Sequence, residues 1–468
     1  MVLCLTRGVE VFSFFLPLLP ISILFSRQVF EGSVWVVEMK TLFERQKEAC
    51  DFFLSRQLED INTIDSSAVG TGKTVVAAHL ARNLGGEVAV ICPKAVIPSW
   101  ERELKETGIK PLFVINYESI RRGRAPFMSK RGKKIMQWHL PKGTLILIDE
   151  IHKCKGAFTQ NAQLLISLVQ QGYRIHGMSA TAAEDPTEMR ALGYMLGLHS
   201  LNKTEGNLKS WYGWMYNSGC APDQWKKWRL ITKKKLDSIK QGIYGVTGHK
   251  LTVDDFPDSF RNNRVFIENV EFSDKKGIQK IYRDLDITPE IVTQYIEEGT
   301  VGDSEWALVN ILRARQLTEA VKVPDIVNMA EDLIDQGNSV VIFVNFKDTV
   351  KALCSQLNCS SIEGGQTIKA RQQIIDDFQD DDENVLVVNI SAGGTGLSLH
   401  DINGKRPRVS LICPSYSAKE FAQTLGRIHR NGAKSDALQK ILVAVDTIEE
   451  NVIQAVNRKL ENMKALHG

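Results

Sequence analysis

The residues whose types and spacing most clearly suit a chemical function lie in a glycine-containing loop at 67–74, with the sequence Ser-Ala-Val-Gly-Thr-Gly-Lys-Thr. Glycines let backbone N–H groups turn toward an anion, and a helix that starts at the end of such a loop adds the positive end of its dipole. Lys73 adds a full charge, and the hydroxyl of Thr74 can hold Mg²⁺. The loop therefore predicts a site for nucleotide phosphates that is formed by Gly70, Thr71, Gly72, Lys73 and Thr74.

A second group of chemically competent residues follows the apolar run at 144–148, which ends in Asp149-Glu150-Ile151-His152. A carboxylate at the carboxyl end of a parallel strand lies beside the phosphate loop of the same sheet. We expect Asp149 to hold Mg²⁺, directly or through water. We expect Glu150 to polarise the water that attacks a phosphoryl group.

The elements around these residues have the order that the chemistry requires. A β-branched run at 61–66 precedes the phosphate loop, and an apolar helical pattern at 75–84 follows it. This strand–loop–helix context favours a true phosphate loop over a chance match, although Ser67 stands where the full pattern has glycine.

Strand-like runs and helical patterns alternate along both halves of the chain, which predicts two α/β units with parallel sheets. The expected strands are 61–66, 87–92, 112–115, 145–148 and 174–178 in the first unit, and 339–344, 385–389, 409–413 and 441–445 in the second. Helical patterns lie at 350–357 and 368–378. We expect two RecA-like lobes at 39–200 and 323–468, separated by a helical insert and linker at 201–322 that includes a helix at 305–320.

The bulk composition is that of a globular protein of two or three domains, with 468 residues, 43% hydrophobic and 24% charged. The net charge of +3 excludes a global basic field, so nucleic-acid contacts must come from a local surface. Eight scattered cysteines without a CxxC pair indicate reduced thiols in an intracellular protein and argue against structural zinc.

Residues 1–38 differ from the rest because they contain the apolar run VFSFFLPLLPISILF at 11–25. The run is short for a membrane-spanning helix, and no convincing cleavage site follows it. We interpret 1–38 as an upstream extension from a wrong start codon, with the start at Met39; a membrane anchor is the alternative.

With these motifs placed, the chain resembles the superfamily 2 helicases, and more closely the Swi/Snf-type DNA-dependent ATPases, over about 39–455. The resemblance rests on motifs that occur in the family's order: LFERQKEA, ICPKAVIPSWERE and Asn-Tyr-Glu at 116–118 before the acidic pair, and Met-Ser-Ala-Thr at 178–181 after it. VVIFVNF, ISAGGTGLSL and QTLGRIHRNG follow in the second half. The Ser-Ala-Thr string is commoner among other superfamily 2 helicases than among Swi/Snf-type proteins.

The resemblance implies an ATP- and Mg²⁺-dependent enzyme whose site is divided between the lobes. It places Gln46 on the adenine, Gly396 at the nucleotide, and Arg427 and Arg430 as arginine fingers. The resemblance also implies that His152, Ser179, Thr181 and Gln423 couple ATP hydrolysis to movement on nucleic acid. The spacing of QxxGRxxR predicts that Gln423, Arg427 and Arg430 share one helical face.

The insert has a strongly basic stretch, with ten basic and three acidic residues between 201 and 250 and four interleaved tryptophans. Lysines interleaved with aromatic residues suit a surface that follows a phosphate backbone, so Lys233, Lys234 and Lys235 are candidate nucleic-acid contacts. Tryptophans that anchor a small core under solvated lysines are an equal alternative, and both interpretations can hold together.

Three functions remain open on the sequence. The PSW segment, GRIHRNG and the RARQLTE string at 313–319 favour a translocase that tracks duplex DNA, whereas Ser-Ala-Thr favours a strand-separating DNA or RNA helicase. A nucleotide-binding scaffold without turnover is disfavoured because Lys73, Glu150 and Arg430 are all present. We expect duplex DNA as the partner with RNA as the alternative, no membrane partner, and a monomer.

Overall fold

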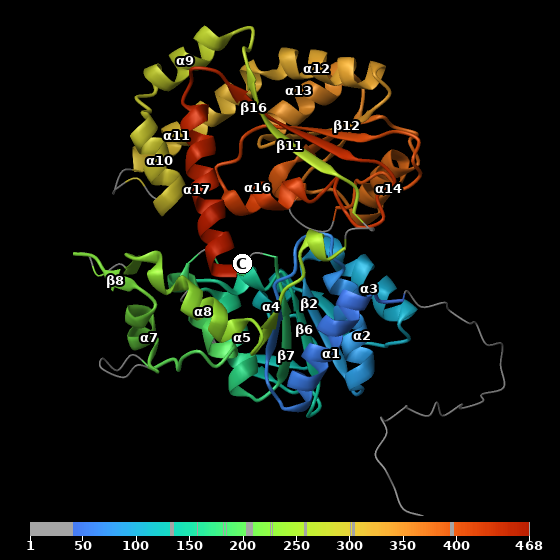
Figure 1. The fold of residues 1–468 in the computed structure, drawn as a ribbon, viewed down its shortest axis with the longest axis vertical. Helices are drawn as coiled ribbons and strands as arrows, with labels where there is room; N and C mark the ends of the chain where they lie inside the picture. Colours follow the sequence, from blue (N-terminus) through green and yellow to red (C-terminus); the bar gives the residue numbers. More distant parts are fainter. Residues whose placement is uncertain are drawn as a thin grey trace, which may run out of the picture. The chain divides into compact units, whose positions relative to one another are not determined.

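The computed structural model describes residues 41–467 except 132–134, 157, 181, 184, 203–208, 225, 227, 257–259, 300, 302–304 and 394–396. Two six-stranded sheets organise these residues, and every strand pairing within each sheet is parallel (Figure 1). The expected fold of two α/β lobes in tandem is therefore confirmed.

The first sheet has the order β10-β1-β7-β6-β2-β3. Its strands are β1 (Thr63–Asp65), β2 (Val88–Cys92), β3 (Phe113–Asn116), β6 (Leu145–Asp149), β7 (Arg174–Met178) and β10 (Gly248–His249). The order puts β7 between β1 and β6, so the carboxyl ends of these three strands are neighbours. The phosphate loop, the acidic pair and Ser179 follow these three ends directly.

Helices cover both faces of this sheet, which explains why its strands are apolar at consecutive positions. Val88 and Val90 of β2 belong to the core cluster that includes residues of α1 (Glu44–Leu58), α2 (Lys73–Leu84) and α3 (Ile97–Glu106). Ala89 and Ile91 belong to the opposite cluster, with α5 (Gln160–Gln170) and α8 (Leu236–Ile243). The period of two along each strand thus divides its side chains between two helical layers.

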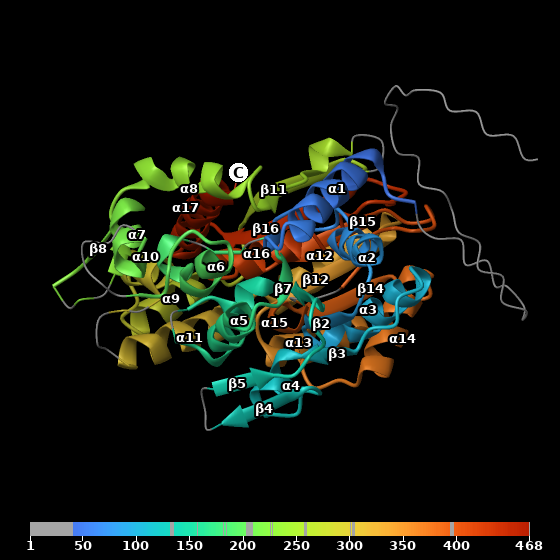
Figure 2. The ribbon, with the colours of Figure 1, turned by 90° about the horizontal axis from the view of Figure 1, so that it is seen from below.

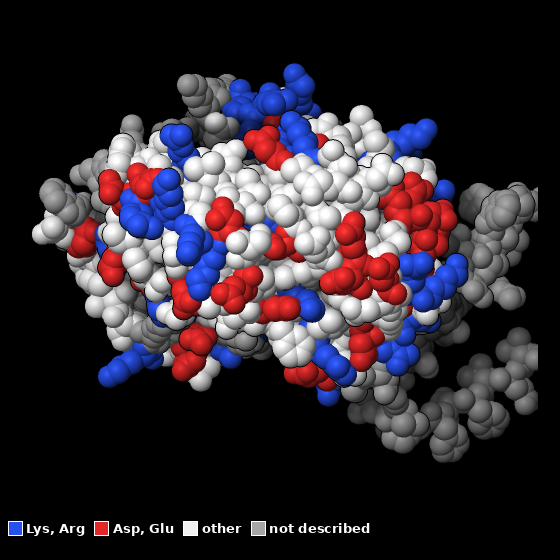
Figure 3. Space-filling model, turned by 90° about the horizontal axis from the view of Figure 1, so that it is seen from above, with Lys and Arg blue, Asp and Glu red and all other residues white. Residues whose placement is uncertain are grey.

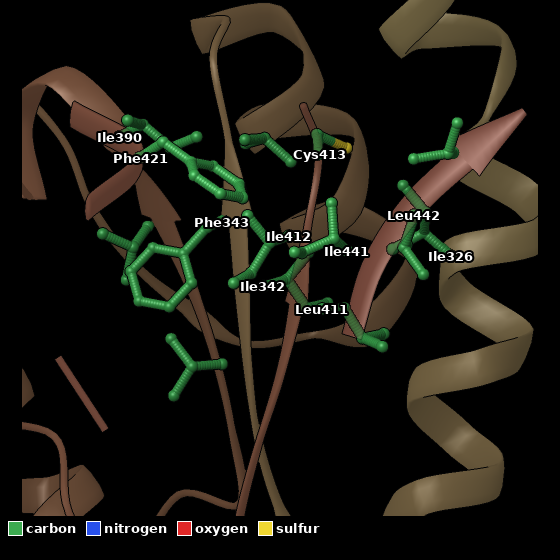
Figure 4. Close-up of a cluster of buried hydrophobic side chains, with 14 of the residues drawn as sticks. Ile326, Ile342, Phe343, Ile390, Leu411, Ile412, Cys413, Phe421, Ile441 and Leu442 are labelled. Carbon is green, nitrogen blue, oxygen red and sulfur yellow. The ribbon is translucent and has the colours of Figure 1, made fainter. Parts of the chain in front are cut away.

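The second sheet has the order β11-β16-β15-β12-β14-β13. Its strands are β11 (Asn263–Val270), β12 (Ser339–Val344), β13 (Ser360–Ile362), β14 (Val385–Asn389), β15 (Arg408–Ile412) and β16 (Ala437–Ala444). Figure 4 shows part of its core, where Ile342 and Phe343 of β12 lie beside Leu411 and Ile412 of β15.

The helices of the second half include those expected from the sequence, among them α13 (Lys347–Leu357) and α14 (Ile368–Gln379). The others are α9 (Lys275–Asp284), α10 (Pro289–Glu298), α11 (Glu305–Val321), α12 (Val323–Asp335), α15 (Ile390–Gly393), α16 (Ala418–Leu425) and α17 (Glu449–His467). The first half also contains α4 (Tyr117–Arg121), α6 (Arg190–Met195) and the antiparallel hairpin of β4 (Met128–Arg131) and β5 (Ile135–Trp138) (Figure 2).

The segment 201–322, expected as a helical insert, also supplies an edge strand to each sheet, because β10 pairs with β1 and β11 pairs with β16. The sequence signal for β10 is weak because this strand is only two residues long. The predicted domain boundaries, which separate the insert at 201–322 from the two lobes, stay a prediction.

Three tryptophans of this segment, Trp211, Trp214 and Trp228, belong to one small core cluster. In α7 (Trp211–Asn217), Trp211 is buried and stacks on Trp214 with ring centroids 5.7 Å apart. The antiparallel pair β8 (Cys220–Pro222) and β9 (Trp228–Leu230) contributes Cys220 and Trp228 to the same cluster. The interpretation of these aromatic residues as core anchors is thus confirmed for Trp211.

No helix in the described part of the chain has both the length and the apolar composition that crossing a bilayer requires.

Candidate active site

The phosphate loop connects β1 to α2 and depends on two glycines with left-handed backbone conformations. Gly70 has φ +86° and Gly72 has φ +91°, a region that is costly for residues with a Cβ. Gly72 is also the residue before the first turn of α2, which begins at Lys73. The free N–H groups of that turn therefore open onto the loop.

Ser67 has a structural reason to replace the expected glycine. Its hydroxyl accepts a hydrogen bond from the Leu251 N–H at 2.9 Å, and the Ala68 N–H donates to the Leu251 carbonyl at 2.8 Å. The chain segment that follows β10 thus fixes the start of the loop. This long-range contact is not visible in the local sequence.

Lys73 lies across the loop, where its Nζ donates to the carbonyls of Ser67 at 2.7 Å and Ala68 at 3.0 Å. Burial lowers the pKa of the Lys73 ammonium, while the carboxylates of Asp65 and Glu150 act in the opposite direction. The ammonium group is thus held inside the loop.

Gln46 and Thr71 stabilise the loop through hydrogen bonds to its backbone. The buried Gln46 side chain donates to the Thr71 carbonyl at 2.7 Å and accepts from the Phe43 N–H at 3.0 Å. The Thr71 hydroxyl turns back to the Ala68 carbonyl at 2.8 Å. The adenine-binding role of Gln46 stays a prediction, and its contact with the loop is an additional finding.

The acidic pair lies at the carboxyl end of β6, as expected. Asp149 is the last residue of this strand, and Glu150 follows with φ +52°, an uncommon conformation for a residue with a side chain. Burial, and then the charge of Glu150, raise the pKa of Asp149. Burial also opposes ionisation of Glu150, but its hydrogen bond with His152 and the cations of the cleft outweigh that effect and lower its pKa. The two carboxyl groups are thus electrostatically distinct.

His152 and Ser179 form a buried contact behind Glu150. The His152 Nδ1 lies 3.0 Å from the Glu150 Oε2 and 2.9 Å from the Ser179 Oγ. Burial lowers the pKa of His152 to about 4, so its ring is neutral near pH 7. The Ser179 N–H donates to the Asp65 carbonyl at 3.0 Å, which ties the end of β7 to β1.

Two expected site residues, Thr181 and Gly396, lie outside the described residues. Their proposed coupling and nucleotide-binding roles therefore stay predictions.

The arginine motif of the second half differs from its expected helical geometry. The helix α16 ends at Leu425, so Gln423 is helical, whereas Arg427 and Arg430 lie beyond the helix. The prediction of one shared helical face is therefore wrong. Glycine is a poor helix former, which favours the end of the helix at Gly426. The missing Cβ also lets the chain pack against the phosphate loop, because a Cβ there would come within 2.5 Å of the Val69 Cγ1.

The same contact brings Arg430 to the phosphate loop. A Cβ placed on Gly70 would lie 3.3 Å from the Arg430 Cγ, which is closer than most real contacts. Burial lowers the pKa of Arg430 to about 10 and that of Arg427 to about 9, so both guanidinium groups are positive at neutral pH. Two cations from the second lobe therefore face the loop of the first.

A cleft of about 770 Å³ joins the expected residues of both lobes. It is lined from the first lobe by Gln46, Gly70, Gly72, Lys73, Thr74, Trp100, Asp149 and Glu150, and from the second by Gln423, Arg427 and Arg430. Thr71, His152 and Ser179 do not line it; each is buried. The geometry thus gathers most of the predicted nucleotide residues at one place.

The donor set fits a hard cation such as Mg²⁺, because the hydroxyl of Thr74 and the carboxylate of Asp149 line the same cleft. No group of three or more His, Cys, Asp or Glu side chains with metal-site geometry occurs among the described residues. A site with so few protein ligands suits an ion that also binds phosphate oxygens.

Comparison with known proteins identifies the family of the chain. The helicase conserved C-terminal domain model matches residues 322–432. A protein of Acanthamoeba polyphaga mimivirus, named as a candidate ATP-dependent RNA helicase, is 32% identical over 453 residues, which cover 91% of this chain and 83% of the relative. The chain belongs to the superfamily 2 helicases of the Swi/Snf type.

Two cellular relatives match the chain with lower identity. The chromatin remodeling factor mit1 of Schizosaccharomyces pombe is 21% identical across 90% of this chain, which spans only 32% of that relative. The Saccharomyces cerevisiae DNA repair and recombination protein RAD54 is 26% identical over 133 residues, or 14% of its length. A solved SWI2/SNF2 ATPase core of Sulfolobus solfataricus with dsDNA is 18% identical, covers 91% of this chain and 92% of its own, and has a TM-score of 0.35.

The lysine run of this helicase lies apart from the nucleotide cleft. Residues 233–235 form a short 3-10 turn before α8, and the side chains of Lys234 and Lys235 are exposed. Neither Lys234 nor Lys235 lines the cleft. Figure 3 shows Lys and Arg side chains mixed with Asp and Glu on the face drawn there, as the small net charge leads one to expect. The nucleic-acid role of the run stays a prediction.

Sequence reasoning missed two aromatic residues that contact the acidic pair. Trp100 donates from Nε1 to the Asp149 Oδ2 at 3.0 Å, and the Tyr117 hydroxyl donates to the Asp149 carbonyl at 2.6 Å. Both lie in motifs that the sequence singled out, the PSW segment and Asn-Tyr-Glu, but only their spatial contacts indicate what they do.

Proposed function

We propose that this helicase hydrolyses ATP in the cleft between its lobes and uses the resulting movement to translocate along duplex DNA. The observation that carries the proposal is the meeting of Gly70 with Arg430, because it brings a second-lobe cation to the phosphate loop. Glu150 and Lys73 line the same cleft from the first lobe. A site of this kind turns over only when both lobes contribute.

Each residue has a defined part in this proposal. Lys73 would bind the terminal phosphates, and Thr74 and Asp149 would hold Mg²⁺, which supplies positive charge to the phosphate oxygens. Glu150, kept ionised by its surroundings, would orient and deprotonate the attacking water. Arg427 and Arg430 would stabilise the charge that develops on the transferred phosphoryl group, an effect worth roughly 10³–10⁵ in rate in related enzymes.

Closure of the split site gives a physical route from chemistry to movement. Nucleotide binding would draw Arg430 onto the phosphate loop, and product release would let the lobes separate. A nucleic acid held by both lobes would then advance with each cycle. Duplex DNA is the favoured track because of the Swi/Snf-type motifs and because relatives carry the names of DNA repair and chromatin remodeling proteins.

A strand-separating helicase is the second candidate. It is favoured by the Ser-Ala-Thr string at 179–181 and by the name of the mimivirus relative, which refers to RNA. The two candidates share the ATP chemistry and differ only in the track and in strand separation.

The substitutions Lys73→Ala and Glu150→Gln test the ATP chemistry. Lys73→Ala removes a charge from the phosphates, so we expect ATP binding to weaken and turnover to disappear. Glu150→Gln keeps the shape but loses the base, so we expect ATP to bind and remain unhydrolysed. Nucleotide affinity and steady-state phosphate release measure the two effects separately.

Glu118→Gln is a suitable control, because Glu118 is an exposed carboxylate on α4 that pairs with Arg121 outside the cleft. It should leave both measurements unchanged. Turnover within a few-fold of the wild type in either site variant would contradict the assignment.

A further inference from the structure

Trp100 has a fixed position beside the Asp149 carboxylate. The indole is only 1% exposed and packs in the first-lobe core cluster that also contains Leu104 and Leu147. Its N–H donates to the Asp149 Oδ2 at 3.0 Å. Because the ring is buried in the core, the direction of this donor is fixed.

The Asp149 carboxylate has one hydrogen bond on each oxygen. The Glu150 N–H donates to Oδ1 at 2.9 Å, and Trp100 donates to Oδ2. A carboxylate has about four lone-pair sites, so acceptor capacity remains for a cation. The two donors fix the rotation of the group and leave this capacity toward the cleft that Asp149 lines.

Tyr117 contacts the backbone of the same two residues. Its buried hydroxyl lies 2.6 Å from the Asp149 carbonyl and 3.4 Å from the Glu150 carbonyl. Glu150 has φ +52° and ψ +49°, a conformation that residues with a Cβ rarely adopt without support. The hydroxyl is placed to support this turn, and the turn directs the Glu150 side chain to its contact with His152.

We infer that Trp100 and Tyr117 are positioning residues with separate tasks. Trp100 orients the Asp149 carboxylate for the metal ion, and Tyr117 holds the left-handed turn that aims Glu150 at the attacking water. The inference rests on the proposed ATP hydrolysis. It predicts that the loss of either donor affects a different measurable step.

The first test uses Trp100→Phe, which removes the indole N–H. We expect the Mg²⁺ concentration that half-saturates binding of a fluorescent, non-hydrolysable ATP analogue to rise about tenfold, as for lost partners of metal ligands. Binding of the analogue in EDTA should stay unchanged. Trp138→Phe is the matched control, because Trp138 is also buried and donates to the Ser167 Oγ at 3.0 Å.

The second test uses Tyr117→Phe, which removes only the hydroxyl. We expect kcat to fall about tenfold, with KM for ATP and the Mg²⁺ midpoint within about twofold of the wild type. Tyr173→Phe is the matched control, because the Tyr173 hydroxyl contacts the backbone of Leu140 and the residue does not line the cleft. It should leave kcat unchanged.

The two variants must give different signatures for the inference to hold. If the Mg²⁺ midpoint of Trp100→Phe equals that of the wild type, Trp100 does not orient Asp149 for the metal ion. If the kcat of Tyr117→Phe equals that of Tyr173→Phe, Tyr117 does not support the turn at Glu150. If Trp100→Phe fails to fold, benzothienylalanine at position 100 keeps the ring volume and removes the N–H, and the same Mg²⁺ titration applies. If Lys73→Ala and Glu150→Gln lose turnover while Trp100→Phe and Tyr117→Phe behave like their controls, this inference is wrong and the proposed ATP hydrolysis still stands.

Discussion

At the residue scale, the site works by giving neighbouring ionisable groups different surroundings. Asp149 and Glu150 are adjacent, yet the pKa of Asp149 is raised and that of Glu150 is lowered. The difference comes from partners, because Glu150 contacts His152 while Asp149 is mainly desolvated. A site of this kind can hold a cation at one carboxylate and a base at the other.

The buried histidines predict how folding stability depends on pH. Burial lowers the pKa values of both His152 and His176 to about 4, below the ordinary 6.5. The unfolded chain therefore takes up protons below pH 6.5 that the folded chain does not, and stability falls as pH falls. We expect a loss of about 1 kcal/mol per histidine between pH 7.5 and 5.5.

Urea unfolding at several pH values measures this dependence. The substitution His176→Gln should make the free energy of unfolding depend less steeply on pH, whatever its effect on absolute stability. A slope that is flat in the wild type over this range, or that is unchanged in His176→Gln, would show that these rings ionise normally in the folded state.

At the element scale, sequence patterns located most strands and helices because their apolar residues are local and continuous. The strands β7, β12 and β14 begin and end as predicted, and α2 begins two residues early, at Lys73. The short strand β10 was missed because two residues carry no periodic signal. Its position is set by pairing with β1, which no local pattern records.

The candidate site was predictable to a similar degree, and for the same reason. Residues at fixed places in linear motifs, such as Lys73, Asp149 and Arg430, were found and line one cleft. The hydrogen bonds of Ser67 with Leu251 and of Trp100 with Asp149 join segments far apart in the sequence. Contacts of this kind are decided by packing and need coordinates.

The end of α16 offers a test of the contact between lobes. Gly426 has an ordinary φ of −84°, so Gly426→Ala is compatible with the local backbone. The added Cβ would lie 2.5 Å from the Val69 Cγ1 and would keep the lobes apart. We expect ATP binding to persist and kcat to fall about tenfold or more, because the arginines can no longer reach the phosphate loop.

A second substitution checks this explanation. Val69→Ala removes both γ-methyl groups and leaves only the Val69 Cβ, 2.8 Å from the added Cβ, so it should restore part of the kcat lost in Gly426→Ala. If the double variant is no faster than Gly426→Ala, the loss comes from α16 itself and not from the interface.

At the scale of the whole molecule, we expect ATP hydrolysis and nucleic-acid binding to use different surfaces. Lys234 and Lys235 lie outside the nucleotide cleft and precede α8, whose apolar face packs in the first-lobe core. A contact made there could therefore be lost without disturbing ATP binding.

Charge reversal of Lys233, Lys234 and Lys235 to Glu tests whether this surface holds nucleic acid. We expect the DNA concentration for half-maximal ATPase stimulation to rise about tenfold or more, since phosphate contacts dominate such binding. Basal hydrolysis should be unchanged. The matched control reverses Lys276, Lys280 and Arg283, which are exposed on α9. If both triple variants change the DNA concentration for half-maximal stimulation equally, the lysine run is an ordinary solvated surface.

The proposal that ATP hydrolysis drives movement along duplex DNA is best tested by ATPase rates measured in parallel with duplex DNA, single-stranded DNA and RNA. We expect the largest stimulation by duplex DNA, with little strand separation. We also expect stimulation to fall steeply as salt rises, because protein binding releases counterions from the phosphates and added salt opposes that release. Stimulation by RNA alone, or efficient unwinding of a tailed duplex, would contradict the proposal.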